Sequence, residues 1–405
     1  MLDLKRVMTP KRVLIFHLLL LSILLLPGLA INYFDATSMM KGFVLSTFVA
    51  FFVFLLYYKD VGISKVYINV LIWLLFFILL HFFFALLLYD DLNIPRSIGS
   101  YFLLCFILIF SCLLASCSKA IESNKFHKIV RSTYYLLILL VCITFPLIQL
   151  HLVHRKSMIF FSEPSHFALA FGPFLLYMMV WSGKLKQHFS IGFVLGLMLT
   201  NLTLIVFALF ALLILSKSKG KIFIAPFLFM GCYLVYLFFG GHFGYFLERV
   251  IISPESDNLS VLVLLSGYER AYLGLFDNYG LGVGFQQMGV VGPMGIIQEK
   301  MVLELNAEGL NVFSGGTFFS KIVVEFGVFG FIAVLAYVAF LPRVIRKIRL
   351  NNFHTAQELF YSSCFIMFVI VVFLRGPGYF SPSVLIFLSS IYWLVNMKRW
   401  ESAST

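Results

Sequence analysis

Long apolar runs recur along the whole chain and limit what it can fold into. A helix of about 20 apolar residues spans the hydrocarbon core of a bilayer. Runs of that kind fall at about 13–31, 41–58, 66–89, 97–117, 131–152, 165–182, 221–239, 317–341, 357–374 and 381–397. Only 12% of the residues are charged and 61% are hydrophobic, whereas roughly a quarter of the residues of a soluble domain are charged. The sequence therefore predicts an all-α polytopic membrane protein.

The stretch 188–216 has lysines on both sides, at Lys184 and Lys186 before it and at Lys217 after it. Lys and Arg favour the cytoplasmic side of a membrane, so a single span here would place one lysine cluster outside. We expect two short helices that meet near the polar residue Asn201. With this pair, the expected number of spans rises to about twelve.

Residues 259–276 are apolar enough to span the membrane, but Glu269 and Arg270 stand side by side near their end. A span here would also place the basic residues of 343–349 outside, against the charge rule. The pattern favours a helix that lies at the interface or docks on the bundle. Arg270 would then share the polar face of this helix with Ser266, above the membrane.

These expectations divide the chain into three parts. Residues 1–239 hold nine spans, 240–316 form one large external loop with short helices, and 317–405 hold three spans and a cytoplasmic tail. Both termini are expected in the cytoplasm, because this places most of the 30 Lys and Arg residues there. The net charge of +12 is then mainly a topology signal, and no nucleic-acid partner is expected.

Motifs of soluble enzymes, such as a Walker loop, GxSxG, HExxH or paired CxxC, are absent from the sequence. What remains is a set of ionisable residues at the expected external side. Charge near a membrane is costly, so it tends to mark a functional site or a buried pair.

The first such cluster lies in the loop before the sixth expected span. His154, Arg155 and Lys156 precede Glu163 and His166. Arg and Lys neutralise phosphate oxygens, and Arg can do so with two parallel bonds, so the cluster could cradle a diphosphate. The same residues also suit an interfacial cap whose basic side chains reach lipid headgroups. The histidines of this loop lack an obvious third metal ligand, and we expect neither a metal nor a cofactor.

The second cluster combines Glu269 and Arg270 with Gly282 and Gly284 further on. Glycines at alternate positions let a backbone approach a ligand or another strand closely. The pattern alone is weak, and a plain tight turn fits it equally well.

Two further groups lie near the last three spans. Arg375 opens a short Gly-Pro-Gly turn that ends at Tyr379, and this turn would hold the arginine close to the bundle. Lys321 and Glu325 are spaced i,i+4 on one helix, so they can satisfy each other. We predict a structural ion pair between them.

The order of these features resembles that of the O-antigen polymerases of the Wzy type. The shared features are Arg155, Phe161-Ser162-Glu163-Pro164-Ser165, the short helices around Asn201, Arg270 with Gly282-Val283-Gly284, and Glu325-Phe326-Gly327-Val328-Phe329-Gly330. The resemblance covers most of the chain in layout but few positions in detail. A proline that often precedes the Gly-x-Gly element is missing, since Tyr279-Gly280 stands there.

The resemblance implies a GT-C-like, metal-independent glycosyltransferase in the bacterial inner membrane, with its active site and large loop facing the periplasm. Such enzymes transfer a growing glycan from undecaprenyl diphosphate to the sugar of a new lipid-linked repeat unit, and arginines hold the diphosphates. Arg155 and Arg270 match the family's arginines, and Arg375 matches by position only. Expected partners are these lipid-linked glycans, the bilayer and a co-polymerase that regulates chain length.

Residue roles follow as hypotheses for a direct displacement at the anomeric carbon. The expected catalytic residues are Arg270, Arg375, Glu163 and Glu269, of which either carboxylate could be the base. The expected substrate- or diphosphate-binding residues are Arg155, Lys156, His154, His166, Lys321, Tyr379, Gly282 and Gly284.

Two alternatives stay open. The related O-antigen ligases typically carry a histidine shortly before the helix with the Glu-x-Gly element, but residues 311–317 contain none, and His242 lies at the other end of the loop. A polytopic transporter or flippase would concentrate ionisable residues at mid-membrane, and this chain has few there. The polymerase is the preferred interpretation.

Overall fold

The computed structural model describes residues 10–34, 39–57, 65–151, 158–216, 248–249, 251–307 and 309–402. In these ranges the chain forms thirteen α-helices and one short 3-10 helix. They are α1 (Pro10–Tyr33), α2 (Met39–Tyr57), α3 (Lys65–Leu88), α4 (Ile94–Lys119), α5 (Ser123–Gln149), α6 (Pro164–Trp181), α7 (Leu185–Met198), α8 (Leu202–Leu215), α10 (Leu259–Phe276), η3 (Asp277–Gly280), α11 (Ile296–Leu303), α12 (Phe318–Arg349), α13 (Ala356–Phe373) and α14 (Pro382–Ser402).

Several helices begin where a polar side chain can accept a hydrogen bond from the first turn. Asn93, Asn201, Thr317 and Thr355 cap α4, α8, α12 and α13 in this way. Such caps satisfy backbone N–H groups that have no partner within the helix. α6 begins instead with Pro164, whose missing N–H costs nothing at a first helical position.

The protein is an all-helical, multi-pass membrane protein. The described part of the chain contains eight helices that are long and apolar enough to cross a membrane, and α2, α8 and α14 are shorter apolar helices. This supports the membrane class, but it does not confirm a count of twelve spans. The expected span at 221–239 lies outside the described residues.

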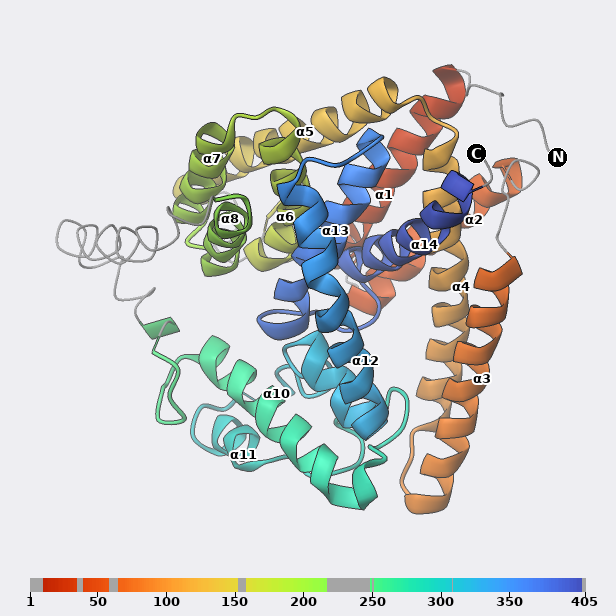
Figure 1. Ribbon diagram of the computed structural model, residues 1–405. Coiled ribbons are helices and arrows are strands. Elements are labelled where there is room, and N and C mark those ends of the chain that lie inside the picture. Colours follow the sequence, from red (N-terminus) through yellow and green to blue (C-terminus); the bar gives the residue numbers. More distant parts are fainter. Residues whose placement is uncertain are drawn as a thin grey trace.

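Helices α6 and α13 lie at the centre of the bundle, and α3 lies at its edge (Figure 1). α13 packs against α5, α6, α12 and α14, whereas most side chains of α3 are exposed. α10 and α11 lie together beside the first half of α12. A large apolar core therefore joins the first and last thirds of the chain.

Both ambiguous stretches form the helices that the sequence predicts. α7 and α8 pack against each other as a hairpin, and the Asn201 side chain donates to the backbone oxygen of Pro164 at the start of α6. The hairpin thereby reaches the residues that follow Glu163. Residues 259–276 form α10, which meets the length and composition of a span and packs mainly on α11 and α12.

Helix α12 is broken at Gly327, whose φ and ψ are 56° and −131°. The oxygens of Val324 and Glu325 accept hydrogen bonds from the N–H groups of Val283 and Gly284, at 3.0 and 2.9 Å. A Cβ at residue 327 would collide with the backbone oxygen of Gly280. The Gly-x-Gly segment is thus a backbone partner of the broken turn of α12.

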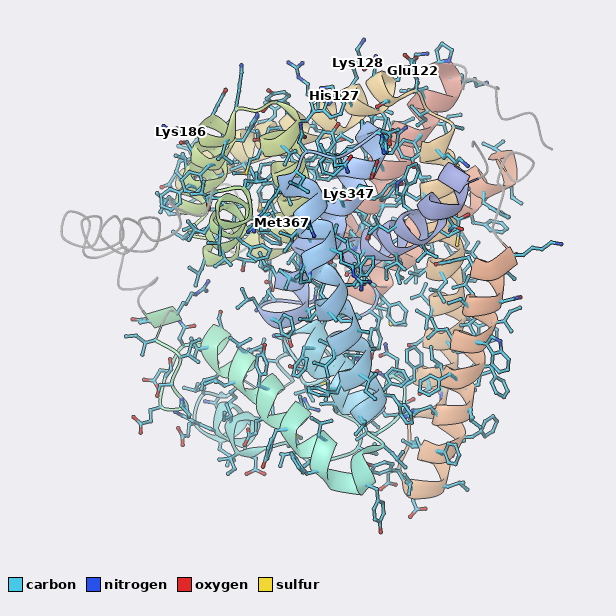
Figure 2. All side chains as sticks on the ribbon, in the orientation of Figure 1. Glu122, His127, Lys128, Lys186, Lys347 and Met367 are labelled. Atoms are coloured by element: carbon cyan, nitrogen blue, oxygen red, sulfur yellow. The ribbon has the colours of Figure 1, made fainter. Side chains whose placement is uncertain are left out.

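Basic side chains gather at the other end of the bundle. Figure 2 shows Lys128 and Lys186 at the end far from α10 and α11. Lys347, in the last turns of α12, pairs with the buried Glu358 near the start of α13.

Candidate functional site

Two polar clusters lie where α6, α12 and α14 begin and α13 ends. The Glu163 cluster consists of Glu163, Ser162, Ser165, His166 and Arg375. The Glu325 cluster consists of Glu325, Lys321, Arg270, Tyr379 and Arg96. The turn 374–381 between α13 and α14 joins them, since it contributes a residue to each cluster.

The Glu163 cluster is built on the first turn of α6. Asn32 near the end of α1 donates to the oxygen of Phe161, and this bond holds the segment before Glu163. Glu163 Oε2 accepts hydrogen bonds from Arg375 Nη2 and from Ser165 Oγ, both at 2.8 Å. The sequence placed Glu163 and Arg375 in one site, and the structure joins them directly.

The charge state of Glu163 follows from these contacts. Burial alone would raise its pKa, but the charge of Arg375, the neighbouring His166 and the bonds from Ser165 and Arg375 hold the pKa below its ordinary value of 4.5. The Glu163 side chain is 46% exposed and that of Arg375 is 25% exposed. The pair is therefore a partly solvated carboxylate and guanidinium of zero net charge.

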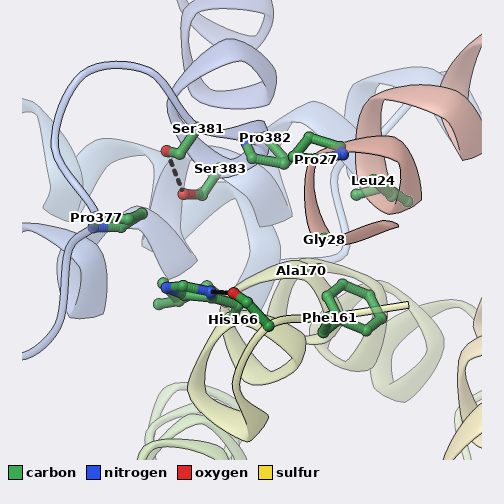
Figure 3. Close-up of a pocket in the computed structure, with 12 residues that line it drawn as sticks. Leu24, Pro27, Gly28, Phe161, His166, Ala170, Pro377, Ser381, Pro382 and Ser383 are labelled. Atoms are coloured by element: carbon green, nitrogen blue, oxygen red, sulfur yellow. Dashed lines mark hydrogen bonds between the residues drawn. The ribbon is translucent and has the colours of Figure 1, made fainter. Parts of the chain in front are cut away.

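His166 lies beside this pair and faces a small pocket. Its Nδ1 is 2.6 Å from Ser162 Oγ. The pocket also touches Pro377 and Ser383, as Figure 3 shows, and its volume of about 20 Å³ is enough for about one water molecule. His166 and Pro377 of the turn 374–381 thus line the same small pocket.

The Glu325 cluster is buried in the first half of α12. Lys321 Nζ is 2.7 Å from Glu325 Oε1, and both side chains are almost fully buried. The predicted i,i+4 ion pair is therefore confirmed. Lys321 Nζ also donates to the backbone oxygen of Phe313 at 2.7 Å and lies 5.1 Å from the centre of the Tyr379 ring.

Arg270 and Arg96 add two more positive charges near Glu325. Both lie within electrostatic range of its carboxylate. Arg270 Nη1 donates to the oxygen of Val312 at 2.7 Å, and the guanidinium of Arg96 lies 4.1 Å from the centre of the Phe313 ring. Three cationic side chains, of which Arg96 is only partly buried, thus interact electrostatically with one carboxylate, which leaves an excess of positive charge there.

Several polar atoms of this cluster have no hydrogen-bond partner among the described residues. They are Arg270 Nε, Glu325 Oε2 and the Tyr379 hydroxyl. Burial and the nearby Glu325 carboxylate raise the pKa of Tyr379 well above its ordinary value, although the two groups do not reach hydrogen-bond geometry. Buried polar atoms usually have partners, so these atoms mark a place where a polar ligand can add bonds.

The position of Arg270 corrects one expectation. The sequence placed it with Ser266 on an exposed polar face, but both side chains are buried, at 3% and 2% exposure. Ser266 donates to Gln298 of α11, and Arg270 reaches the loop before α12. The polar face of α10 is turned toward α11 and this loop, which cover it.

The other candidate residues occupy different surroundings. Glu269 accepts bonds from the N–H groups of Ile296 and Ile297, both at 2.9 Å, and so caps α11. Gly282 and Gly284 pack on the backbone of α12 and on α3. His154, Arg155 and Lys156 lie outside the described residues.

Arg96 is the one cation of the cluster that the sequence did not single out. It sits in the first turn of α4, where its own N–H donates to Asn93. Its partner Phe313 is 217 positions away in the chain. An arginine at the expected external end of a span was the signal that could have found it.

No protein-family model matches the chain, and no curated protein matches its sequence. Within the described ranges, no group of three or more His, Cys, Asp and Glu residues could hold a metal ion.

Proposed function

We propose that this protein is a glycosyltransferase that polymerises undecaprenyl-diphosphate-linked oligosaccharide repeat units. One observation carries the proposal: Arg270, Lys321 and Arg96 share a single buried carboxylate, that of Glu325, as electrostatic partner, near the turn that also supplies Arg375 to Glu163. A surplus of buried cations is stable when an anion binds there. A diphosphate supplies both the charge and the acceptor oxygens.

An apolar groove next to this cluster supports a lipid-linked substrate. Its volume is about 650 Å³, within the usual range of ligand pockets. Phe318 and Ile322, on either side of Lys321, line one end, and Phe340 and Val395 lie further along α12 and α14. A hydrocarbon chain in this groove would bring an attached diphosphate to the cations.

The proposed reaction is a direct displacement. An acceptor hydroxyl oxygen forms a bond to the anomeric carbon of the donor glycan, and the bond from that carbon to the diphosphate oxygen breaks. The electron pair leaves with undecaprenyl diphosphate, whose growing charge Arg270 and Lys321 stabilise. Glu163 takes the hydroxyl proton as general base.

The ion pair with Arg375 controls how strong a base Glu163 is. While the two are paired, the pKa of Glu163 is low and the carboxylate is a weak base. A diphosphate that draws Arg375 away would raise this pKa and strengthen the base. Substrate binding and base activation would then be coupled through one arginine.

The proposal also includes an orientation. Because Lys128 and Lys186 lie at the end far from α10 and α11, we place that end and both termini in the cytoplasm and the clusters at the periplasmic face of a bacterial inner membrane. The acceptor and donor would then meet outside the cytoplasm. A co-polymerase that regulates chain length is a proposed partner.

Deletion and complementation test this function. Loss of the polymer ladder with survival of a single-repeat band, in gels of surface glycan, is the expected result for a polymerase. Loss of all attached repeats, with polymer left on the carrier lipid, would identify a ligase instead. A plasmid carrying Lys300→Ala is the matched control and should restore the full ladder, since Lys300 donates to the backbone oxygen of Pro254 and belongs to neither cluster.

A flippase or transporter is the second candidate, because α12 combines a buried ion pair with a broken turn at Gly327. Discontinuous helices and buried charges are typical of transporters. Flux of lipid-linked glycan in proteoliposomes, without change in glycan length, would favour this candidate and contradict the polymerase.

A further inference from the structure

The three cations of the Glu325 cluster all contact one short loop. Arg270 donates to the oxygen of Val312 and Lys321 to the oxygen of Phe313, both at 2.7 Å. Arg96 lies over the Phe313 ring at 4.1 Å. Residues 311–313, which we name the loop segment, therefore occupy the place where a buried anion would bind.

The bonds from Arg270 and Lys321 to the loop segment resemble those that they could donate to a phosphate group. Two carbonyl oxygens that accept from two cationic side chains present partial negative charge to them, as phosphate oxygens would with full charge. Carbonyl oxygens do not neutralise the surplus charge of the cluster. The Nε atom of the buried Arg270 has no hydrogen-bond partner among the described residues. The guanidinium can therefore donate a hydrogen bond to a ligand in addition to the one that Val312 accepts.

The loop segment contacts these side chains and also its own loop, because Val312 is buried beside Gly289 and the oxygen of Asn311 accepts from the N–H groups of Ser314 and Gly315. Phe313 is 47% exposed, and the chain around it turns through left-handed conformations at Asn311, Gly315 and Gly316. No helix includes residues 304–316 among those the structure describes. The segment can thus leave its place without unfolding a helix.

We propose that Arg96, Arg270 and Lys321 form one diphosphate-binding site, and that a lipid-linked diphosphate enters it by displacing the loop segment 311–313. This inference rests on the proposed function and adds to it the loop segment that contacts all three cations. It also assigns the loop a regulatory role: in the resting state the loop segment covers the cations until a diphosphate replaces its carbonyl oxygens.

Binding of farnesyl diphosphate to the purified full-length protein tests the inference. Phe313→Ala removes the ring that holds Arg96 and leaves all three cations in place. Because a covered site binds with an affinity reduced by the fraction of uncovered protein, this variant should bind about two- to fivefold tighter than wild type. Arg96→Ala should bind more weakly, since a guanidinium bond to phosphate is stronger than a contact with a ring. Leu303→Ala, at an exposed residue of α11, is the control and should bind like wild type.

Thiol labelling gives an independent readout of loop movement. Ser314→Cys, beside the loop segment, should react faster with a water-soluble maleimide when farnesyl diphosphate is present. Leu303→Cys should react at the same rate with and without it, and the unsubstituted chain measures the reaction of the native cysteines. Inorganic diphosphate in parallel separates the lipid source from free diphosphate, because the isoprenyl compound should bind more tightly.

The outcomes separate the two proposals. Equal or weaker binding by Phe313→Ala, with unchanged labelling at position 314, overturns the loop inference but does not contradict the proposed polymerase function. Absence of diphosphate binding in wild type and in all variants overturns both.

Discussion

The two clusters differ in burial and in charge balance. The Glu325 cluster is buried, lies beside a broken helix and holds three cations to one carboxylate, whereas the Glu163 cluster is partly exposed and neutral. Charges in a buried site are not screened by water, so their interactions are strong and costly to disturb. Charges in a partly exposed site can exchange partners cheaply. The first cluster is suited to hold an anion, and the second to a group whose protonation and pairing change.

Removal of the buried carboxylate should have the largest effect. Glu325→Gln leaves Lys321 without its partner, and an uncompensated buried charge costs about 3–5 kcal/mol. We expect a large loss of folded protein in detergent, measured by size-exclusion chromatography and thermal unfolding.

The control for this loss is the double variant Lys321→Met with Glu325→Met. It replaces the pair by apolar side chains of similar size, which is often neutral for stability. The double variant should recover folding but not glycan polymerisation. A stable Glu325→Gln variant would contradict the difference in burial between the two clusters.

Gly327→Ala should have the next largest effect. Residue 327 has a positive φ and a Cβ there would meet the backbone of Gly280. A side chain in such a conformation costs about 1–3 kcal/mol, and the collision adds to it. The midpoint of thermal unfolding should fall clearly. Gly99→Ala in α4, where a Cβ meets nothing within 4 Å, should leave it unchanged or slightly raised.

The sequence could predict those features that depend on residues close together in the chain. The i,i+4 spacing of Lys321 and Glu325 predicted their pair, because one helix fixes that distance. The lengths of the apolar runs predicted most helices, and the lysines around 188–216 predicted the α7–α8 hairpin. In each case the information is local.

Contacts between distant segments were harder to predict. The sequence did not reveal that Val283 and Gly284 donate to the backbone oxygens of α12. The break of α12 at Gly327 depends on this approach of two segments some forty residues apart. The burial of Arg270 depends on α11 and on the loop before α12, which cover α10. The position of Arg270 on the polar face of its own helix therefore predicted an exposed side chain, which was wrong. The contact of Arg96 with Phe313 joins two segments for which no sequence pattern exists.

Arg270 should have an intermediate effect on stability and a large effect on activity. Arg270→Ala leaves the Val312 oxygen without its donor, which costs about 1–3 kcal/mol, and removes a cation from the site. Arg270→Lys keeps the charge but loses the planar fork that grips two oxygens. The glycan ladder should shorten with Lys and disappear with Ala, while protein levels fall only moderately. A full-length ladder from the Ala variant, at any protein level, would remove Arg270 from the site.

The smallest effect on stability is expected at the exposed pair. The folded pKa of Glu163 lies below its ordinary value of 4.5, so its pairing with Arg375 stabilises the fold above that pH. The contribution should be lost as the pH falls below 4.5 through the lowered folded pKa. Because both side chains are partly exposed, the contribution should be at most about 1 kcal/mol and should shrink in high salt. Glu163→Gln should therefore unfold at nearly the wild-type temperature at pH 7, and the small difference from wild type should shrink as the pH falls below 4.5. Polymerisation should nevertheless be lost at pH 7, since the amide cannot accept the hydroxyl proton. A large drop in stability would instead make Glu163 a structural residue like Glu325, and the distinction between the two clusters would fail.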